Sequence, residues 1–134
     1  MLPDKILDVF QDEEAVLLAI IRAYYLSKGQ TIFAGDQTPD RDLESKLPFV
    51  RVGRVGGAPI RGSEHTDRPV IDIDVLAGTR ADAKRIANEI EQLLMSRPKP
   101  IDDCNVLMGP QRVPWVEGVP IRRMYASYQL SLRR

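Results

Sequence analysis

The chain has 134 residues, of which 43% are hydrophobic and 28% charged, and this composition is ordinary for one globular domain with its own core. The 19 basic and 19 acidic side chains cancel, which argues against a protein whose whole surface grips nucleic acid. The single cysteine, Cys104, excludes an internal disulfide, and with the single histidine, His65, it cannot complete a four-ligand zinc site.

Targeting and membrane signals are weak in this sequence. The first ten residues are mixed and charged, unlike a signal peptide, and the longest apolar run, Ala15–Ile21, is far shorter than a membrane span. We therefore expect a soluble protein of a reducing compartment, folded as a single domain over residues 1–134, with no membrane partner.

Charge is distributed unevenly along the chain. Residues 1–14 hold five acids and one lysine, whereas residues 122–134 hold four arginines and no acid. Opposed charge at the two ends of a chain suits head-to-tail contacts between copies. The alternative interpretation is a mixed, solvated surface on which each charge contributes little.

The first predicted helix covers Asp12–Lys28. Its acidic start complements the positive end of a helix dipole, and Gly29 fits the position after the helix. Ala15–Ile21 is apolar nearly all round, which predicts either burial on several sides or a surface shared with another subunit.

Residues 30–68 are predicted to form two strands, each followed by a loop. Gln30–Gly35 fits a short edge strand, and Asp36–Lys46 is a polar loop with a helical turn. Alternating side chains predict a strand over Pro48–Arg54. The glycine-rich stretch Gly56–Arg68 is predicted to be a long, flexible connection.

The clearest local pattern is a strand followed by a helix. Apolar and polar residues alternate over Pro69–Ala77, which predicts a strand with one buried face. Gly78 then breaks the pattern, and an apolar stripe with a three- and four-residue repeat predicts an amphipathic helix over Thr79–Met95. Pro98 stops this helix.

The last third of the chain predicts one long strand and little else. Asn105–Met108 fits a short strand, and Gly109–Gly118 is expected to be irregular with Trp115 packed down. Alternation over nine residues makes Val119–Leu132 the best strand signal in the sequence.

These elements predict an α/β (α+β) fold, a two-layer sandwich. We expect a mainly antiparallel sheet of about four strands with both helices, Asp12–Lys28 and Thr79–Met95, on one face. The predicted core consists of Ile73, Val75, Ile86, Ile90, Leu93, Tyr128 and Leu130.

Catalytic patterns find little support. Asp72 and Asp74 share one strand face and could bind Mg²⁺ or Mn²⁺, but a nuclease needs a third converging acid, and a solvated strand face is the simpler interpretation. Gly53–Gly57 lacks the ending of a phosphate-binding loop, and His65 lacks the partners of a triad. Ser63 and Cys104 lack the flanking residues of a catalytic nucleophile. The sequence therefore predicts no catalytic residue, no cofactor and no metal site.

The order of these elements resembles the tail terminator, or tail completion, proteins of long-tailed phages, especially those of actinobacterial phages and prophages. The resemblance spans roughly residues 12–133 and depends on the order and the residue composition of several segments, not on a catalytic motif. After the acidic apolar helix, the segments that carry it are Leu47-Pro48-Phe49-Val50, Arg54–Gly57, Asp67–Val70, the Ala/Ile helix, Gly109-Pro110 and Tyr125–Arg133.

The resemblance implies a structural protein of the virion, assembled in the host cytoplasm into a ring, typically a hexamer. Such a ring caps the head-proximal end of the tail tube, stops its polymerisation and joins the tail to the head. Its implied partners are other copies of itself, the tail tube protein, a head-side neck protein and the genome DNA, which passes through the lumen without sequence-specific binding.

The family has no short motif that assigns functional residues, so the candidate subunit or tube contacts come from the distribution of arginine. They are Arg51, Arg54, Arg61, Arg68, Arg122, Arg133 and Arg134. The alternatives left open are another neck or head–tail joining protein, a monomeric α/β regulatory module and, last, a metal-dependent nuclease that uses Asp72 and Asp74.

Overall fold

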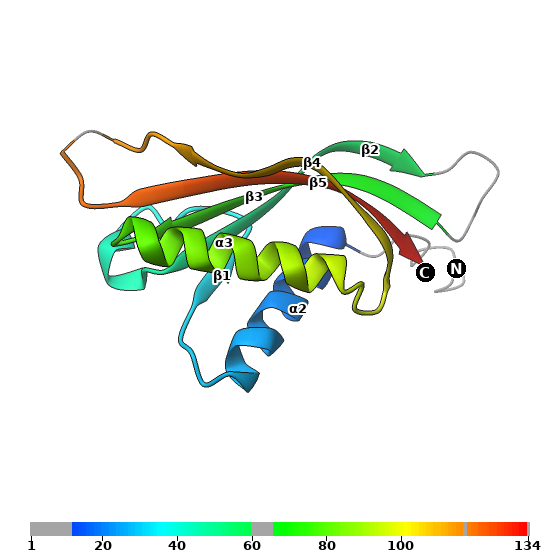
Figure 1. Ribbon diagram of the computed structural model, residues 1–134, viewed down its shortest axis with the longest axis horizontal. Coiled ribbons are helices and arrows are strands. Elements are labelled where there is room, and N and C mark those ends of the chain that lie inside the picture. Colours follow the sequence, from blue (N-terminus) through cyan, green and yellow to red (C-terminus); the bar gives the residue numbers. More distant parts are fainter. Residues whose placement is uncertain (1–11, 60–65, 117, 134) are drawn as a thin grey trace, which may run out of the picture.

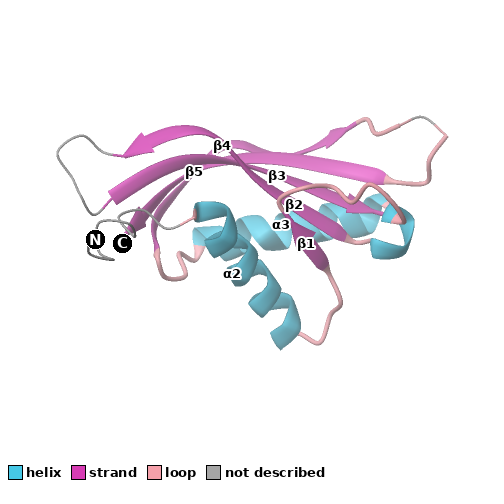
Figure 2. Cartoon of the chain, turned by 180° about the vertical axis from the view of Figure 1, so that it is seen from behind, coloured by secondary structure: helices cyan, strands magenta, loops and turns pink. Residues whose placement is uncertain are grey.

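The protein folds into one sheet with two helices on one of its faces (Figure 1; Figure 2). The computed structural model describes residues 12–59, 66–116 and 118–133. The elements in chain order are α2 (Glu13–Ser27), β1 (Phe33–Gly35), the 3-10 helix η1 (Leu43–Lys46), β2 (Phe49–Pro59), β3 (Thr66–Ala77), α3 (Arg80–Met95), β4 (Ile101–Val113) and β5 (Arg122–Arg133). The predicted two-layer α+β fold is confirmed, with five strands in place of about four.

The sheet has the strand order β1-β2-β3-β5-β4. Short β1 runs parallel to β2, and the other three pairings are antiparallel. Alternate residues of β3 and β5 point toward the helices and form one apolar core with them. The predicted core is confirmed, except that Leu93 is only partly buried.

Helix α2 is capped at its start and is buried along one side. The Asp12 carboxylate accepts hydrogen bonds from the backbone N–H groups of Glu14 and Ala15 at 3.0 and 3.2 Å. Buried residues include Leu17 and Tyr25, whereas Leu26 is 80% exposed. Among the described residues, therefore, α2 is buried along one side only.

Helix α3 lies beneath the sheet along its strands (Figure 1). The Thr79 hydroxyl caps it by accepting from the Asp82 N–H at 3.2 Å. Two buried tyrosines attach this helix to its neighbours, because Tyr25 of α2 donates to Glu89 and Tyr128 of β5 donates to Glu91, each at 3.2 Å.

The largest error of sequence analysis is β4. This strand runs from Ile101 to Val113, whereas we expected only Asn105–Met108, with an irregular segment from Gly109. Three irregularities in its pairing with β5 break the alternation, and its position at the sheet edge leaves most of its side chains exposed. The same analysis began β5 too early, at Val119 instead of Arg122.

The predicted loop Gly56–Arg68 is wrong at both of its ends. Gly56–Pro59 belongs to β2 and pairs with Asp67–Val70 of β3, which extends the hairpin. A bulge between Arg54 and Gly56 and the small side chains that follow hide the period of two. The rest of that predicted loop lies outside the described residues.

The sheet face opposite the helices, called here the outer face, carries a second apolar group at one end. Phe49 and Leu76 alternate with buried residues of the helix side and therefore point to the outer face. This outer cluster consists of Phe49, Leu76 and Ile121, with Leu43, Leu47, Trp115 and Val119 packed against them. The prediction that Trp115 packs down onto the fold is confirmed.

Candidate functional site

The outer face holds a buried carboxylate between two arginines. One oxygen of Asp74 accepts from Nη2 and Nε of Arg51 at 2.7 and 3.2 Å, and the other accepts from Nε of Arg123 at 2.7 Å. The Asp74 side chain is only 5% exposed. The expectation of a solvated strand face is thus wrong for Asp74, which joins β2, β3 and β5.

This arrangement removes the paired-carboxylate site that the Asp72-Ile73-Asp74 sequence suggested. Both oxygens of Asp74 are occupied by guanidinium groups, so that Asp74 does not offer a free ligand. Asp72 lies beside Tyr125, whose pKa is raised by burial and by this carboxylate. Among the described residues, no group of three His, Cys, Asp or Glu side chains could hold a metal ion.

A different site forms at the sheet end where β5 begins. Because β5 is antiparallel to both β3 and β4, its first residues meet the ends of those strands. Arg122 pairs with Ala77, three residues before Arg80 at the start of α3, and Met124 pairs with Arg112. Three arginines from three different elements are thereby brought to one place.

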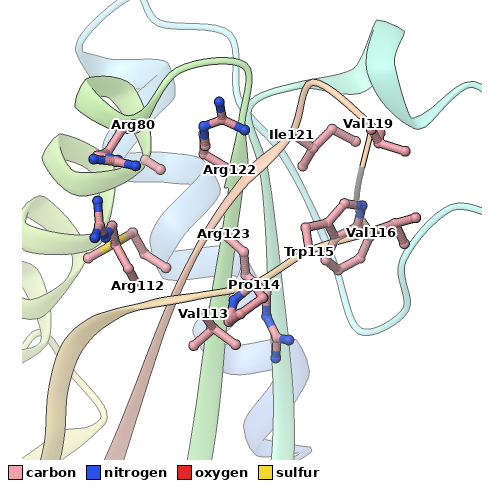
Figure 3. A pocket seen from close by; sticks show the side chains of 13 residues that line it. Arg80, Arg112, Val113, Pro114, Trp115, Val116, Val119, Ile121, Arg122 and Arg123 are labelled. Carbon is pink, nitrogen blue, oxygen red and sulfur yellow. The ribbon is translucent and has the colours of Figure 1, made fainter.

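These arginines border an open pocket of about 520 Å³. Figure 3 shows Arg80 and Arg112 on one side of Arg122, with Trp115 and Val119 on the other. Arg80, Arg112 and Arg122 are exposed and form no ion pair within the part of the chain that the structure describes. We call these three residues the arginine flank.

The other wall of the pocket is apolar. Val113, Trp115, Val119 and Ile121 line it, and two of its residues, Trp115 and Val119, belong to the periphery of the outer cluster. Arg123 also lines the pocket, but its guanidinium is held by Asp74. The pocket therefore offers positive charge that is unpaired within the described residues beside an apolar surface, which suits a ligand with carboxylate or phosphate groups and some apolar area.

Acidic residues are concentrated in one segment that packs against the outer cluster. The segment between β1 and β2 contains η1, whose Leu43 packs into the outer cluster. Four exposed acids stand in this segment, and we call them the acidic flank: Asp36, Asp40, Asp42 and Glu44. No ion pair within the described residues uses any of the four.

The predicted contact residues are distributed over several places. Arg51 is paired with Asp74, and Arg54 forms an ion pair of 3.0 Å with Glu13 at the start of α2. Arg68 is exposed on β3, and Arg122 belongs to the arginine flank. Arg133 is the last residue of β5. Arg61 and Arg134 lie outside the described residues.

The basic C-terminal region is divided by the fold. Arg122 and Arg123 begin β5 and Arg133 ends it, so the two groups lie at opposite ends of a 12-residue strand. At about 3.3 Å per residue, they are separated by roughly 35 Å. The arginines of residues 122–133 therefore do not form one continuous basic patch.

Sequence analysis missed Arg80, Arg112 and Arg123 as members of this site. Each stands within three residues of the end of a strand, and the antiparallel order of the sheet brings strand ends together. Arg112 can be placed beside Arg122 only when β4 is predicted to extend to Val113, and the sequence analysis ended this strand at Met108.

Comparison with known families identifies the family of this chain. The family model described as phage tail termination protein matches residues 9–117, a span of 109 among the 134 residues of the chain. The chain belongs to the phage tail termination protein family. The match runs through α2, β1, β2, β3, α3 and β4 and stops before β5.

Membership of the phage tail termination family confirms the resemblance expected from the order of elements, and it makes this chain a structural phage tail protein. No curated protein matches the sequence. In the described residues, none of the helices has the length and apolar character needed to cross a membrane.

Proposed function

We propose that this protein forms a ring on the head-proximal end of the phage tail tube, where it stops polymerisation of the tube and joins the tail to the head. The observation that carries the proposal is the family match over residues 9–117, since tail termination is an act of assembly performed at a tube end. Its partners are further copies of itself, the tail tube protein and a head-side neck protein.

The subunit has features that suit a ring. Heterologous contacts, in which one surface meets a different surface of the next copy, close into a ring when the rotation allows. The two sheet edges differ, because β1 covers only Phe49–Arg51 of β2 while β4 is a full-length edge strand. Apolar side chains such as Leu26 and Leu107 are more than half exposed and supply area for such contacts.

We propose a hexamer, the number typical of the terminators that this chain resembles, with the genome passing through its lumen. Zero net charge supports passage of DNA without tight, sequence-independent binding, which would need many basic contacts. Subunits meet weakly in solution and close the ring on the tube, so a monomer in solution agrees with the proposal.

The proposal is tested with tail tubes polymerised from the tube protein of the same phage or prophage genome. Purified protein is added to preformed tubes, and gold-labelled antibody locates it by negative-stain microscopy. We expect label at one end of each tube and none along its length. Absence of label from the tube ends would contradict the proposal and favour the alternative of another neck protein.

A further inference from the structure

We propose that the arginine flank of one subunit binds the acidic flank of the next subunit in the ring. This inference rests on the proposed function, because it names the surfaces through which the ring closes. The occupant of the arginine pocket is then a second copy of this chain, and the chemistry is pairing of guanidinium with carboxylate groups.

The arginine flank is ready to receive carboxylates. Arg80, Arg112 and Arg122 come from the start of α3, the end of β4 and the start of β5, and none has an ion-pair partner in the described part of its own chain. Guanidinium groups form two parallel hydrogen bonds with a carboxylate, a geometry that gives orientation as well as attraction.

The acidic flank is the matching surface. Its segment, residues 36–46, contains four acids against Arg41 and Lys46, a net charge of −2 from −4 and +2. The four carboxylates are exposed and unpaired within the described residues, and Leu43 fixes their segment on the outer cluster. Asp42 and Glu44, the neighbours of Leu43, are thus held at the sheet end where the arginine flank lies.

The sheet order keeps the two flanks apart within one chain. The acidic flank follows β1 and precedes β2, whereas the arginine flank lies by β5, β4 and α3, so that β3 lies between them. From β2 to β4 are three strand spacings, about 14 Å in all. A rotation that places copies side by side brings the acidic flank of one against the arginine flank of the other.

Apolar side chains accompany both flanks. Val106, Leu107 and Met108 on edge strand β4 are 41–53% exposed, and Phe33 on edge strand β1 is 41% exposed. An exposed edge with apolar side chains is a surface that another chain readily covers. The same side-by-side contact that pairs the charges would bury these residues.

The local chemistry favours a protein segment over DNA as the occupant. The three arginines of the flank stand at one pocket with an apolar wall, while the chain as a whole is neutral. Non-specific DNA binding depends on many phosphate contacts spread along a surface. A peptide segment with carboxylates and a few apolar atoms matches both walls of the pocket.

The test uses charge reversals at exposed positions. Arg80→Glu with Arg112→Glu reverses the arginine flank, and an acid at the start of α3 is favourable for the helix. Asp40→Lys with Glu44→Lys reverses the acidic flank and leaves Asp42, whose φ of 57° favours Asp, unchanged. Lys84→Glu with Lys99→Glu is the matched control, since both lysines are exposed and outside the flanks.

Capped tube ends are counted by negative-stain microscopy across a protein titration. We expect each flank reversal to raise the concentration needed for half-maximal capping at least about tenfold, which corresponds to about 1.4 kcal/mol. The control pair should cap like the unmodified protein. Because reversing both flanks in one chain restores opposite charges at the contact, this fourfold variant should cap within about threefold of the unmodified protein.

Mixing the two flank variants gives a second, independent readout. In an alternating ring, each contact joins either two unmodified flanks or two reversed flanks, so an equal mixture should cap although neither variant does alone. Circular dichroism establishes that each variant is folded before it is used.

The outcomes separate this inference from the proposed function. If the unmodified protein caps tubes and the flank reversals cap equally well, the flank contact is wrong while the proposed function stands. If reversal weakens capping and neither the fourfold variant nor the mixture recovers it, pairing between the flanks is also wrong. Loss of binding to labelled duplex DNA in the arginine variant alone, with capping unchanged, would assign the pocket to DNA.

Discussion

Replacing Asp74 with Asn should lower the free energy of unfolding by about 2–3 kcal/mol. The substitution keeps the shape of the side chain, but it removes the charge that holds three hydrogen bonds from Arg51 and Arg123 at 2.7–3.2 Å. It also turns an NH₂ donor toward a guanidinium that can only donate. Removing one partner of a buried ion pair costs about 3–5 kcal/mol.

The expected loss lies below that range because the arginines are not fully buried. The side chains of Arg51 and Arg123 are 43% and 24% exposed, so water can hydrate both guanidinium groups once the carboxylate is gone. Asp72→Asn is the matched control. Among the described residues, one oxygen of Asp72 is buried and has no hydrogen-bond partner, so neutralising this side chain should cost less than about 1 kcal/mol.

Urea denaturation followed by circular dichroism measures both variants at pH 7. A double-mutant cycle with Arg123→Met isolates the contribution of the ion pair from other effects of the substitution. Equal losses for Asp74→Asn and Asp72→Asn, or a coupling energy near zero with Arg123, would refute the view that Asp74 joins the three central strands.

The remaining predictions concern the core and its titratable groups. Ile90→Ala should cost about 2–5 kcal/mol in chemical denaturation, because Ile90 is 1% exposed and its removal leaves a cavity; a cost below 1 kcal/mol would contradict this. Burial and a neighbouring carboxylate raise the pKa of Tyr25 and Tyr128 above the ordinary 10.0. Their stabilising contribution is therefore complete below about pH 10 and is lost as pH rises further, so Tyr128→Phe should flatten the fall in stability above pH 10. Burial raises the pKa of the Cys104 thiol to about 11, and a thiol reagent at pH 8 should label it far more slowly in the folded than in the unfolded chain.

Local patterns predicted the parts of the fold in which sequence period and burial agree. The strand before Gly78 and the helix after it were found because each buries one continuous face and a cap separates them. Edge strand β4 escaped because bulges disrupt its period and few of its side chains are buried. The glycine-rich end of β2 escaped because its pairing depends on backbone groups, which leave no side-chain pattern.

The candidate site was less predictable than the fold because it depends on which strand ends meet. Arg122 was selected for its place in a basic segment, but Arg80 and Arg112 join it only through antiparallel pairing across β3, β5 and β4. The burial of Asp74 was also not predictable from local sequence. Its alternation with apolar residues predicted a solvated face, and the two arginines that bury it come from strands distant in sequence.

The length of the tail tubes is the most direct test of the central claim, that this protein stops tube polymerisation. Tube protein is polymerised with increasing amounts of this protein present from the start, and the lengths of several hundred tubes are measured by microscopy. The account predicts that mean length falls as the ratio of this protein to tube protein rises, with a cap at one end of each finished tube. An unchanged length distribution at saturating protein would contradict tail termination by this chain.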